Sequence, residues 1–198
     1  MPLIKLNNRS IKDVTSLPFG VGNMILISSQ TASNSASISF TTGINSTYKE
    51  YQFYFIDVHP RTDAVFFQFN ISIDSGSNYN VTKTTTAFNA QHSEAGTDAG
   101  IGYQSPQDLA QGTGYQDLSE SIGSGADESC AGSLQLFNPS STTYVKHFIS
   151  NVNTYQSDNY NMNFFSAGYG NTTSAVNAVQ FKMSSGNFDG TIAMFGVV

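Results

Sequence analysis

Two pairs of acidic residues are the first candidates for catalytic chemistry in this sequence. Glu94 lies four residues before Asp98, and Asp127 is followed directly by Glu128. Glycoside hydrolases hold two carboxyl groups roughly 5–10 Å apart across a cleft. Both pairs here lie in segments rich in glycine and serine, and the chain has no tryptophan to serve as a platform for a sugar. The pattern is typical of solvated loop acids, so we expect no catalytic residue and no enzymatic activity.

Metal-binding and nucleophilic patterns are equally weak. The three histidines, His59, His92 and His147, are far apart in the sequence, whereas zinc needs three or four convergent ligands. Residues 74–80 alternate oxygen-bearing groups as calcium loops do, but they contain a single carboxylate and are better explained as a hairpin turn. Cys130 is the single cysteine and is expected to be a small core residue. We therefore expect no metal site and no cofactor.

Four tyrosines are the candidate binding residues: Tyr103, Tyr115, Tyr155 and Tyr160. Each lies in a polar segment, and exposed tyrosine among asparagine and serine is typical of adaptable binding surfaces. Such loops suit contact with a glycan or with a protein. Ordinary solvated loops explain the same residues, and the sequence does not decide between these interpretations.

The composition excludes several classes of partner. Charged residues make up 11% of the chain, against about 25% in an ordinary domain, and the net charge is −6. Because the few Lys and Arg residues are dispersed, we expect no nucleic-acid binding. Apolar runs are far shorter than the ~20 residues of a membrane span, so we expect no membrane-spanning segment. The first residues lack the apolar region of a signal peptide, which predicts synthesis in a cytoplasm without an export signal.

Hydrophobic alternation predicts an all-β fold. About ten short segments alternate or are rich in β-branched and aromatic residues, and Gly, Ser, Asn and Asp separate them. They are residues 24–29, 35–40, 50–58, 64–73, 79–88, 133–137, 143–152, 163–169, 178–183 and 191–197. We expect a single antiparallel β-sandwich, jelly-roll-like, over residues 24–198.

Details of this sandwich also follow from the pattern. Segments 50–58 and 64–73 are expected to form a hairpin about the turn at 59–63, and residues 91–129 to be loops with a helical turn or two within 107–110 and 115–122. The expected core residues are Phe53, Phe55, Val65, Phe67, Phe69, Ile71, Leu134, Leu136, Phe148, Phe181, Ile192 and Met194.

Residues 1–23 are expected to form an extended N-terminal attachment arm. Lys5, Arg9 and Lys12 outnumber its single acid, Asp13, so the arm is basic on an acidic protein. This asymmetry favours docking on an acidic partner surface.

The second half of the chain resembles a known group of proteins. It reads L-F-N-P-S-S-T-T-Y-V-K-H-F at 136–148, then A-G-Y-G-N-T-T-S-A at 167–175, S-S-G-N at 184–187 and T-I-A-M-F-G-V at 191–197. In this order the segments resemble small β-sandwich structural proteins of marine tailed bacteriophages, often labelled tail-fibre or hypothetical structural protein. The resemblance covers roughly residues 24–198 and brings no catalytic or ligand-binding residue.

The resemblance implies a non-enzymatic structural protein on the surface of a tailed-phage virion, either a capsid decoration protein or a short fibre or tail-associated module. The alternative is a receptor- or carbohydrate-binding module of tail-fibre type, which would act through aromatic loops. Expected partners are further copies of the chain in a homotrimer, capsid or tail subunits and, for the alternative, a host-surface glycan. The trimer is expected because a chain with few charges and many aromatics exposes apolar surface that neighbouring copies would bury.

Overall fold

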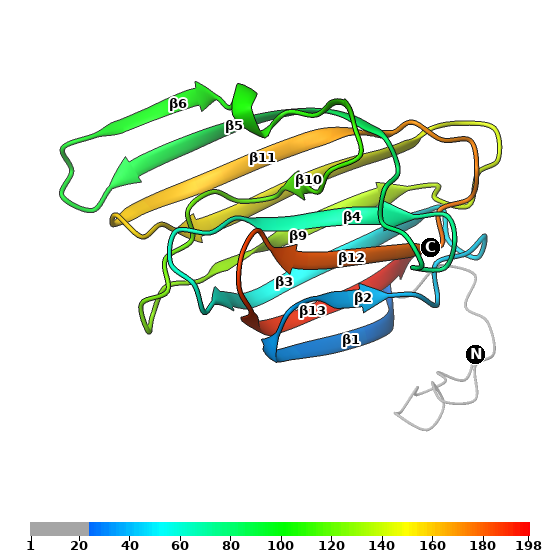
Figure 1. The fold of residues 1–198 in the computed structure, drawn as a ribbon, viewed down its shortest axis with the longest axis horizontal. Coiled ribbons are helices and arrows are strands. Elements are labelled where there is room, and N and C mark those ends of the chain that lie inside the picture. Colours follow the sequence, from blue (N-terminus) through cyan, green and yellow to red (C-terminus); the bar gives the residue numbers. More distant parts are fainter. Residues whose placement is uncertain (1–23) are drawn as a thin grey trace, which may run out of the picture.

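The computed structural model describes residues 24–198, which fold as two antiparallel β-sheets packed face to face (Figure 1). The larger sheet has nine strands, with β7 paired to β5 outside the main order. That order is β1 (Met24–Ser35), β13 (Phe188–Val197), β3 (Glu50–Pro60), β9 (Cys130–Phe137), β10 (Lys146–Tyr155), β11 (Tyr160–Gly170), β5 (Lys83–Ser93) and β6 (Ala99–Tyr103). β7 is Ala110–Gly112.

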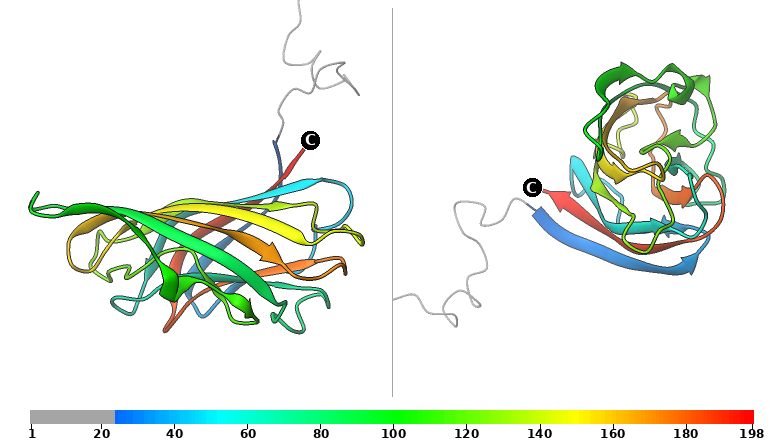
Figure 2. Two further views of the ribbon diagram at one scale, coloured as in Figure 1. Left: turned by 90° about the horizontal axis from the view of Figure 1, so that it is seen from above. Right: turned by 90° about the vertical axis from the view of Figure 1, so that its left-hand side faces the viewer.

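The smaller sheet has four strands in the order β2 (Ile38–Phe40), β12 (Ala178–Met183), β4 (Phe67–Ser72) and β8 (Gln116–Asp117). It lies in front of β3, β9 and β13 in Figure 1, while β11, β5 and β6 extend beyond it. A single 3-10 turn, η1 (Ser105–Gln107), belongs to the segments that cover this remaining part. Two further views show that the ends of β1 and β13 project together from the sandwich (Figure 2). The expected antiparallel β-sandwich is confirmed, with thirteen strands rather than about ten.

An aromatic layer holds the two sheets together. Phe181 of β12 lies at its centre, with ring centroids 5.3 Å from Phe53, 5.2 Å from Phe55 and 5.8 Å from Phe67. Offset and edge-to-face contacts of this kind stabilise a core beyond the burial of area alone. Every core residue expected from the alternation is buried. The period-two pattern therefore identified the inward face of each of these strands correctly.

The expected hairpin between residues 50–58 and 64–73 is wrong. β3 lies in the larger sheet between β13 and β9, whereas β4 lies in the smaller sheet between β12 and β8. The segment between them therefore carries the chain from one sheet to the other. The turn at 74–80 likewise connects β4 to β5 of the opposite sheet, so it is a turn but not a hairpin. A short polar turn looks the same in both situations, because the pairing partner is set by residues far away in the chain.

Residues 91–129 contain more strand than expected and no helical turn at 115–122. This stretch includes the end of β5 together with β6, β7 and β8. Leu118 and Ile122 are buried, and their backbone N–H groups donate to the carbonyl oxygens of Phe67 and Val65. Their spacing of four residues suggested a helical face. Pairing with the edge of β4 overrides that weak local preference.

The predicted attachment arm, with Lys5, Arg9 and Lys12, lies outside the described residues.

Replacing Phe67 with Ala should lower the free energy of unfolding by about 3–5 kcal/mol, because the ring is fully buried between Phe55 and Phe181. Urea or guanidinium denaturation measures the loss. The control is Tyr144→Ala, since Tyr144 is an aromatic residue outside the strands that is 70% exposed. Equal losses for the two variants would contradict the assigned core.

Candidate functional site

The outer face of the larger sheet carries a cluster of apolar side chains on β5, β10 and β11. Strand register places Phe88 opposite Phe165, Ile149 opposite Ala167, and His147 opposite Tyr169. Facing residues of neighbouring antiparallel strands lie about 5 Å apart, so the two side chains of each pair lie side by side. The third position of each row is a neutral polar residue: Asn151, Thr86 and Thr84, respectively. The rings of Phe88 and Phe165 stack with centroids 4.8 Å apart. We call the group the apolar patch: Phe88, Phe137, His147, Ile149, Phe165, Ala167 and Tyr169.

The apolar patch is open to solvent and without formal charge. Ile149 is 50% exposed, and a shallow depression of about 570 Å³ lies between Phe137, His147 and Tyr169. None of the outward-facing residues of β5, β10 and β11 is Asp, Glu, Lys or Arg. At the sheet edge the patch continues onto β6, where Ile101 is 82% exposed. Burial of such a surface against another apolar or neutral surface is favourable, because it removes apolar area from water without desolvating a charge.

A polar groove adjoins the apolar patch on the same face. It contains four asparagines of β10 and β11, namely Asn151, Asn153, Asn161 and Asn163. Its two connected parts have volumes of about 490 and 320 Å³, with Tyr54 in one part and Tyr155 in the other. Asn153 Nδ2 donates to Asn161 Oδ1 at 2.8 Å, while Asn163 Oδ1 is buried with no hydrogen-bond partner in the described residues. Glu94 also lines the second part. The groove thus offers amide donors and acceptors between two aromatic rings, with one carboxyl group at its Tyr155 end.

The four predicted tyrosines do not form one site. Tyr103 lies on the outer face beside Phe88, at the open edge of the larger sheet, and its hydroxyl donates to Asp108. Tyr155 borders the asparagine groove, whereas Tyr160 lines a cavity on the opposite face of the same sheet. Tyr115 lies next to β12 of the smaller sheet. Its hydroxyl donates to Gln180 Oε1, and the centroid of its ring is 4.4 Å from Lys182 Nζ.

The apolar patch was missed because its members come from segments interpreted only as core strands. One signal was present in the sequence. Phe164 and Phe165 are adjacent in β11, and successive residues of a strand point to opposite faces. One of two neighbouring phenylalanines must therefore face outward unless both faces are buried.

Three of the acids singled out in the sequence lie around Tyr155, and the fourth, Asp98, lies beside Tyr160. Glu94, Asp127 and Glu128 lie around Tyr155 and raise the pKa of its phenol, although partial burial is the larger cause. Within residues 24–198 no three Asp, Glu, His or Cys side chains are grouped so that they could hold a metal ion. Asp74 accepts hydrogen bonds from Ser72 and Asn78, which lower its pKa to about 2 and use its carboxylate within the turn.

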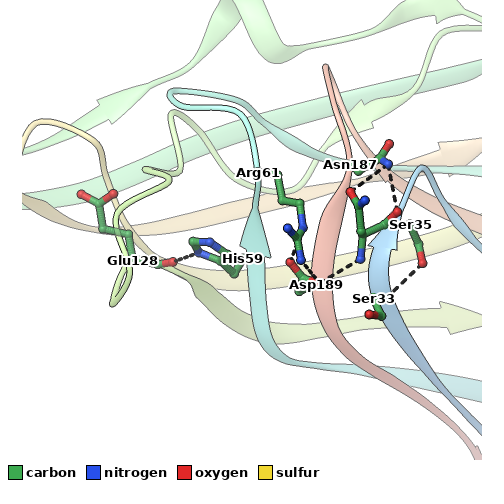
Figure 3. A network of polar contacts seen from close by, with 8 residues as sticks. Ser33, Ser35, His59, Arg61, Glu128, Asn187 and Asp189 are labelled. Atoms are coloured by element: carbon green, nitrogen blue, oxygen red, sulfur yellow. Dashed lines mark hydrogen bonds and ion pairs between the residues drawn. The ribbon is translucent and has the colours of Figure 1, made fainter.

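His59 has a structural role. Its Nδ1 lies 2.6 Å from the carbonyl oxygen of Glu128, which joins β3 to the loop before β9 (Figure 3). Nearby, Arg61 forms an ion pair with Asp189 at 2.8 Å, and the backbone N–H of Asn34 donates to the same carboxylate. These contacts join β1, β3 and β13 at one end of the sandwich.

Two lysines are buried beside Gly170 without an acidic partner in the described residues. Lys83 Nζ donates to Asn70 Oδ1 at 2.5 Å and to the carbonyl oxygen of Val81 at 2.9 Å. Lys146 Nζ donates to the carbonyl oxygens of Tyr144 and Thr172. Burial disfavours the charged amine and lowers both pKa values, that of Lys83 to about 7.

Stability should rise between pH 7 and 10 because of Lys83. Its pKa is about 7 in the folded chain and 10.5 for an ordinary lysine exposed by unfolding, so in this range the unfolded state binds more protons and deprotonation favours folding. The contribution is at most about 1.4 kcal/mol per pH unit. Denaturant unfolding at several pH values measures it, and Lys83→Met should remove the part of the rise due to Lys83 while leaving that of Lys146. An identical pH profile for wild type and variant would show that burial of this amine is not linked to folding.

Within the described residues, no helix has the length and hydrophobicity needed to span a bilayer. No protein-family model, curated protein or solved structure matches the chain.

Proposed function

We propose that this chain is a non-enzymatic structural protein of a tailed-phage virion surface, either a capsid decoration protein or a short fibre or tail-associated module. The observation that carries the proposal is the uncharged apolar patch on the outer face of the larger sheet. The resemblance of the sequence to phage β-sandwich proteins supports the same role.

The patch supports assembly because of its position as well as its chemistry. It reaches β6, an edge strand with the sequence A-G-I-G-Y that has no charged residue to block pairing with another strand. A partner could add to this edge and cover the neighbouring rings in one interface. The proposed partners are further copies of the chain, in a homotrimer, and capsid or tail subunits.

A second exposed apolar segment lies at the start of β1. Met24, Ile25 and Leu26 are all exposed on the part of β1 that projects from the sandwich together with β13. They follow directly on residues 1–23, which we propose to be the attachment arm. Apolar contact here would reinforce the electrostatic docking proposed for Lys5, Arg9 and Lys12.

Light scattering on the purified protein tests the oligomer. Wild type should have a mass near three times 21.3 kDa at micromolar concentration. Ile149→Asp should dissociate it to single chains, because a carboxylate in the apolar patch would be buried without a partner. Ile73→Asp is the matched control, since Ile73 is exposed just beyond β4, outside the larger sheet. A single-chain mass for wild type, or an Ile149→Asp variant that stays assembled, contradicts the proposal.

The asparagine groove favours a second function, recognition of a neutral host-surface glycan. Amide side chains bond sugar hydroxyl groups as both donors and acceptors, and the rings of Tyr54 and Tyr155 offer apolar faces to a sugar. This version places the contact on the sheet rather than on the aromatic loops expected from the sequence.

An array of bacterial oligosaccharides tests this second function. Neutral glycans should bind in preference to acidic ones, and Asn151→Ala with Asn163→Ala should weaken binding at least about tenfold, as expected for the loss of two buried hydrogen bonds. Asn78→Ala, in the exposed turn after β4, is the control. The candidate function is contradicted if wild type binds no neutral glycan, or if the Asn151→Ala, Asn163→Ala variant binds as tightly as the Asn78→Ala control.

A further inference from the structure

A polar cavity of about 360 Å³ lies on the inner face of the larger sheet, beyond the reach of the four-stranded sheet. Its walls come from β5, β11 and the loops that close over them. Four side chains matter for its chemistry: Asn89, Glu120, Gln156 and Asp158. No lysine or arginine is among its lining residues.

Two carboxyl groups share this cavity. Glu120 is half-buried, and its Oε2 atom is buried without a hydrogen-bond donor in the described residues. Burial raises the pKa of Glu120, and the negative charge of Asp158 raises it further. An unpaired carboxylate oxygen in this position is costly unless a cation or a proton balances it.

The two amides of the cavity are orientated by Met162. Asn89 and Gln156 are only 3% and 6% exposed, and each lies with its side-chain nitrogen 3.5 Å from Met162 Sδ. A thioether accepts hydrogen bonds and cannot donate, so the NH₂ group of each amide must face the sulfur. Both carbonyl oxygens therefore point away from Met162, and neither accepts a hydrogen bond from the described residues. Gln156 Nε2 also donates to the backbone carbonyl oxygen of Glu120 at 3.4 Å, which supports the same orientation of this amide.

The two loops that carry the acids are fastened to each other. Ile122 pairs with Gln156 in an isolated β-bridge, and Ser157 N–H donates to the carbonyl oxygen of Ser121 at 3.1 Å. Gln156 N–H also donates to the carbonyl oxygen of Tyr160 at 2.9 Å, which closes the turn around Asp158. The acids therefore sit on a preorganised frame rather than on independent loops.

We propose that this cavity is a calcium site in which the carboxylates of Glu120 and Asp158 and the amide oxygens of Asn89 and Gln156 are the protein ligands. Ca²⁺ takes six to eight oxygen ligands, including carboxylates, amide carbonyls and water, and tolerates irregular geometry. Water completes the shell in the remaining volume. With two carboxylates, the affinity falls in the range of extracellular modules, about 10⁻⁴–10⁻³ M. The bound ion would hold the loops around residues 120 and 157 against the larger sheet, whichever partner the outer face binds.

Tb³⁺, which replaces Ca²⁺ in oxygen sites, provides the probe. Tyr160 lines the cavity and the chain has no tryptophan, so excitation of tyrosine should give Tb³⁺ emission that millimolar CaCl₂ displaces. In parallel, the thermal midpoint should rise with CaCl₂ and saturate in the same concentration range, relative to NaCl of equal ionic strength.

Glu120→Gln and Asp158→Asn keep the shape of each side chain and remove its charge. Each should weaken Tb³⁺ emission and Ca²⁺ displacement at least tenfold, while circular dichroism shows the fold retained. Asp57→Asn is the control, because Asp57 is an exposed acid on β3, away from the cavity, in a left-handed conformation that asparagine also adopts. No sensitised emission from wild type, or emission equally reduced in Asp57→Asn and Glu120→Gln, would overturn the assignment. Stabilisation by a neutral sugar with no response to CaCl₂ would overturn it as well.

Discussion

The packing of a nine-stranded sheet against a four-stranded one is the constraint on which the other features of this protein depend. Phe181 of the small sheet contacts Phe53 and Phe55 of β3 in the larger sheet, the first ring tilted and the second edge-to-face, and these contacts join the layers. This aromatic layer lies where the sheets overlap. A sheet of four short strands has too few inward-facing residues to cover the whole inner face of its larger partner, so the strands beyond it need other cover.

Both candidate surfaces follow from this mismatch. On the inner side, β5 and β11 are covered by loops, and loops bring polar groups whose hydrogen bonds are incomplete. The apolar core in this region is a small separate cluster of Ala87, Met162 and Phe164. The buried amide side chains of Asn89 and Gln156 lie beside it. On the outer side no second layer exists within residues 24–198, and the same strands present stacked rings to solvent. The strands that the small sheet leaves uncovered thus carry both the proposed contact surface and the proposed ion site.

The sequence predicted which residues are buried far better than it predicted their partners. Alternation is a local property, so Phe53, Phe67 and Leu134 could be assigned to the core without knowing which strands pair. β4 belongs to the smaller sheet because it pairs with β12, which is more than a hundred residues away in the sequence. The residues of the polar turn after β3 do not indicate this pairing. The same limit applies to the ion site. Asn89 and Gln156 come from distant segments, and only the pairing of β5 with β11 brings them to one methionine sulfur.

The most direct test of the central claim asks whether the apolar patch is covered in the assembled protein. Cys130 is buried in the core and burial raises the pKa of its thiol, so the native chain should react little with a maleimide and give a low background. A cysteine at Ile149 reports on the patch, and one at exposed Ser185, in the turn before β13, reports on free surface. Labelling rates are measured on the assembled protein. Ile149→Cys should react at least tenfold more slowly than Ser185→Cys if a partner covers the patch, whereas equal rates would contradict a contact role for this face.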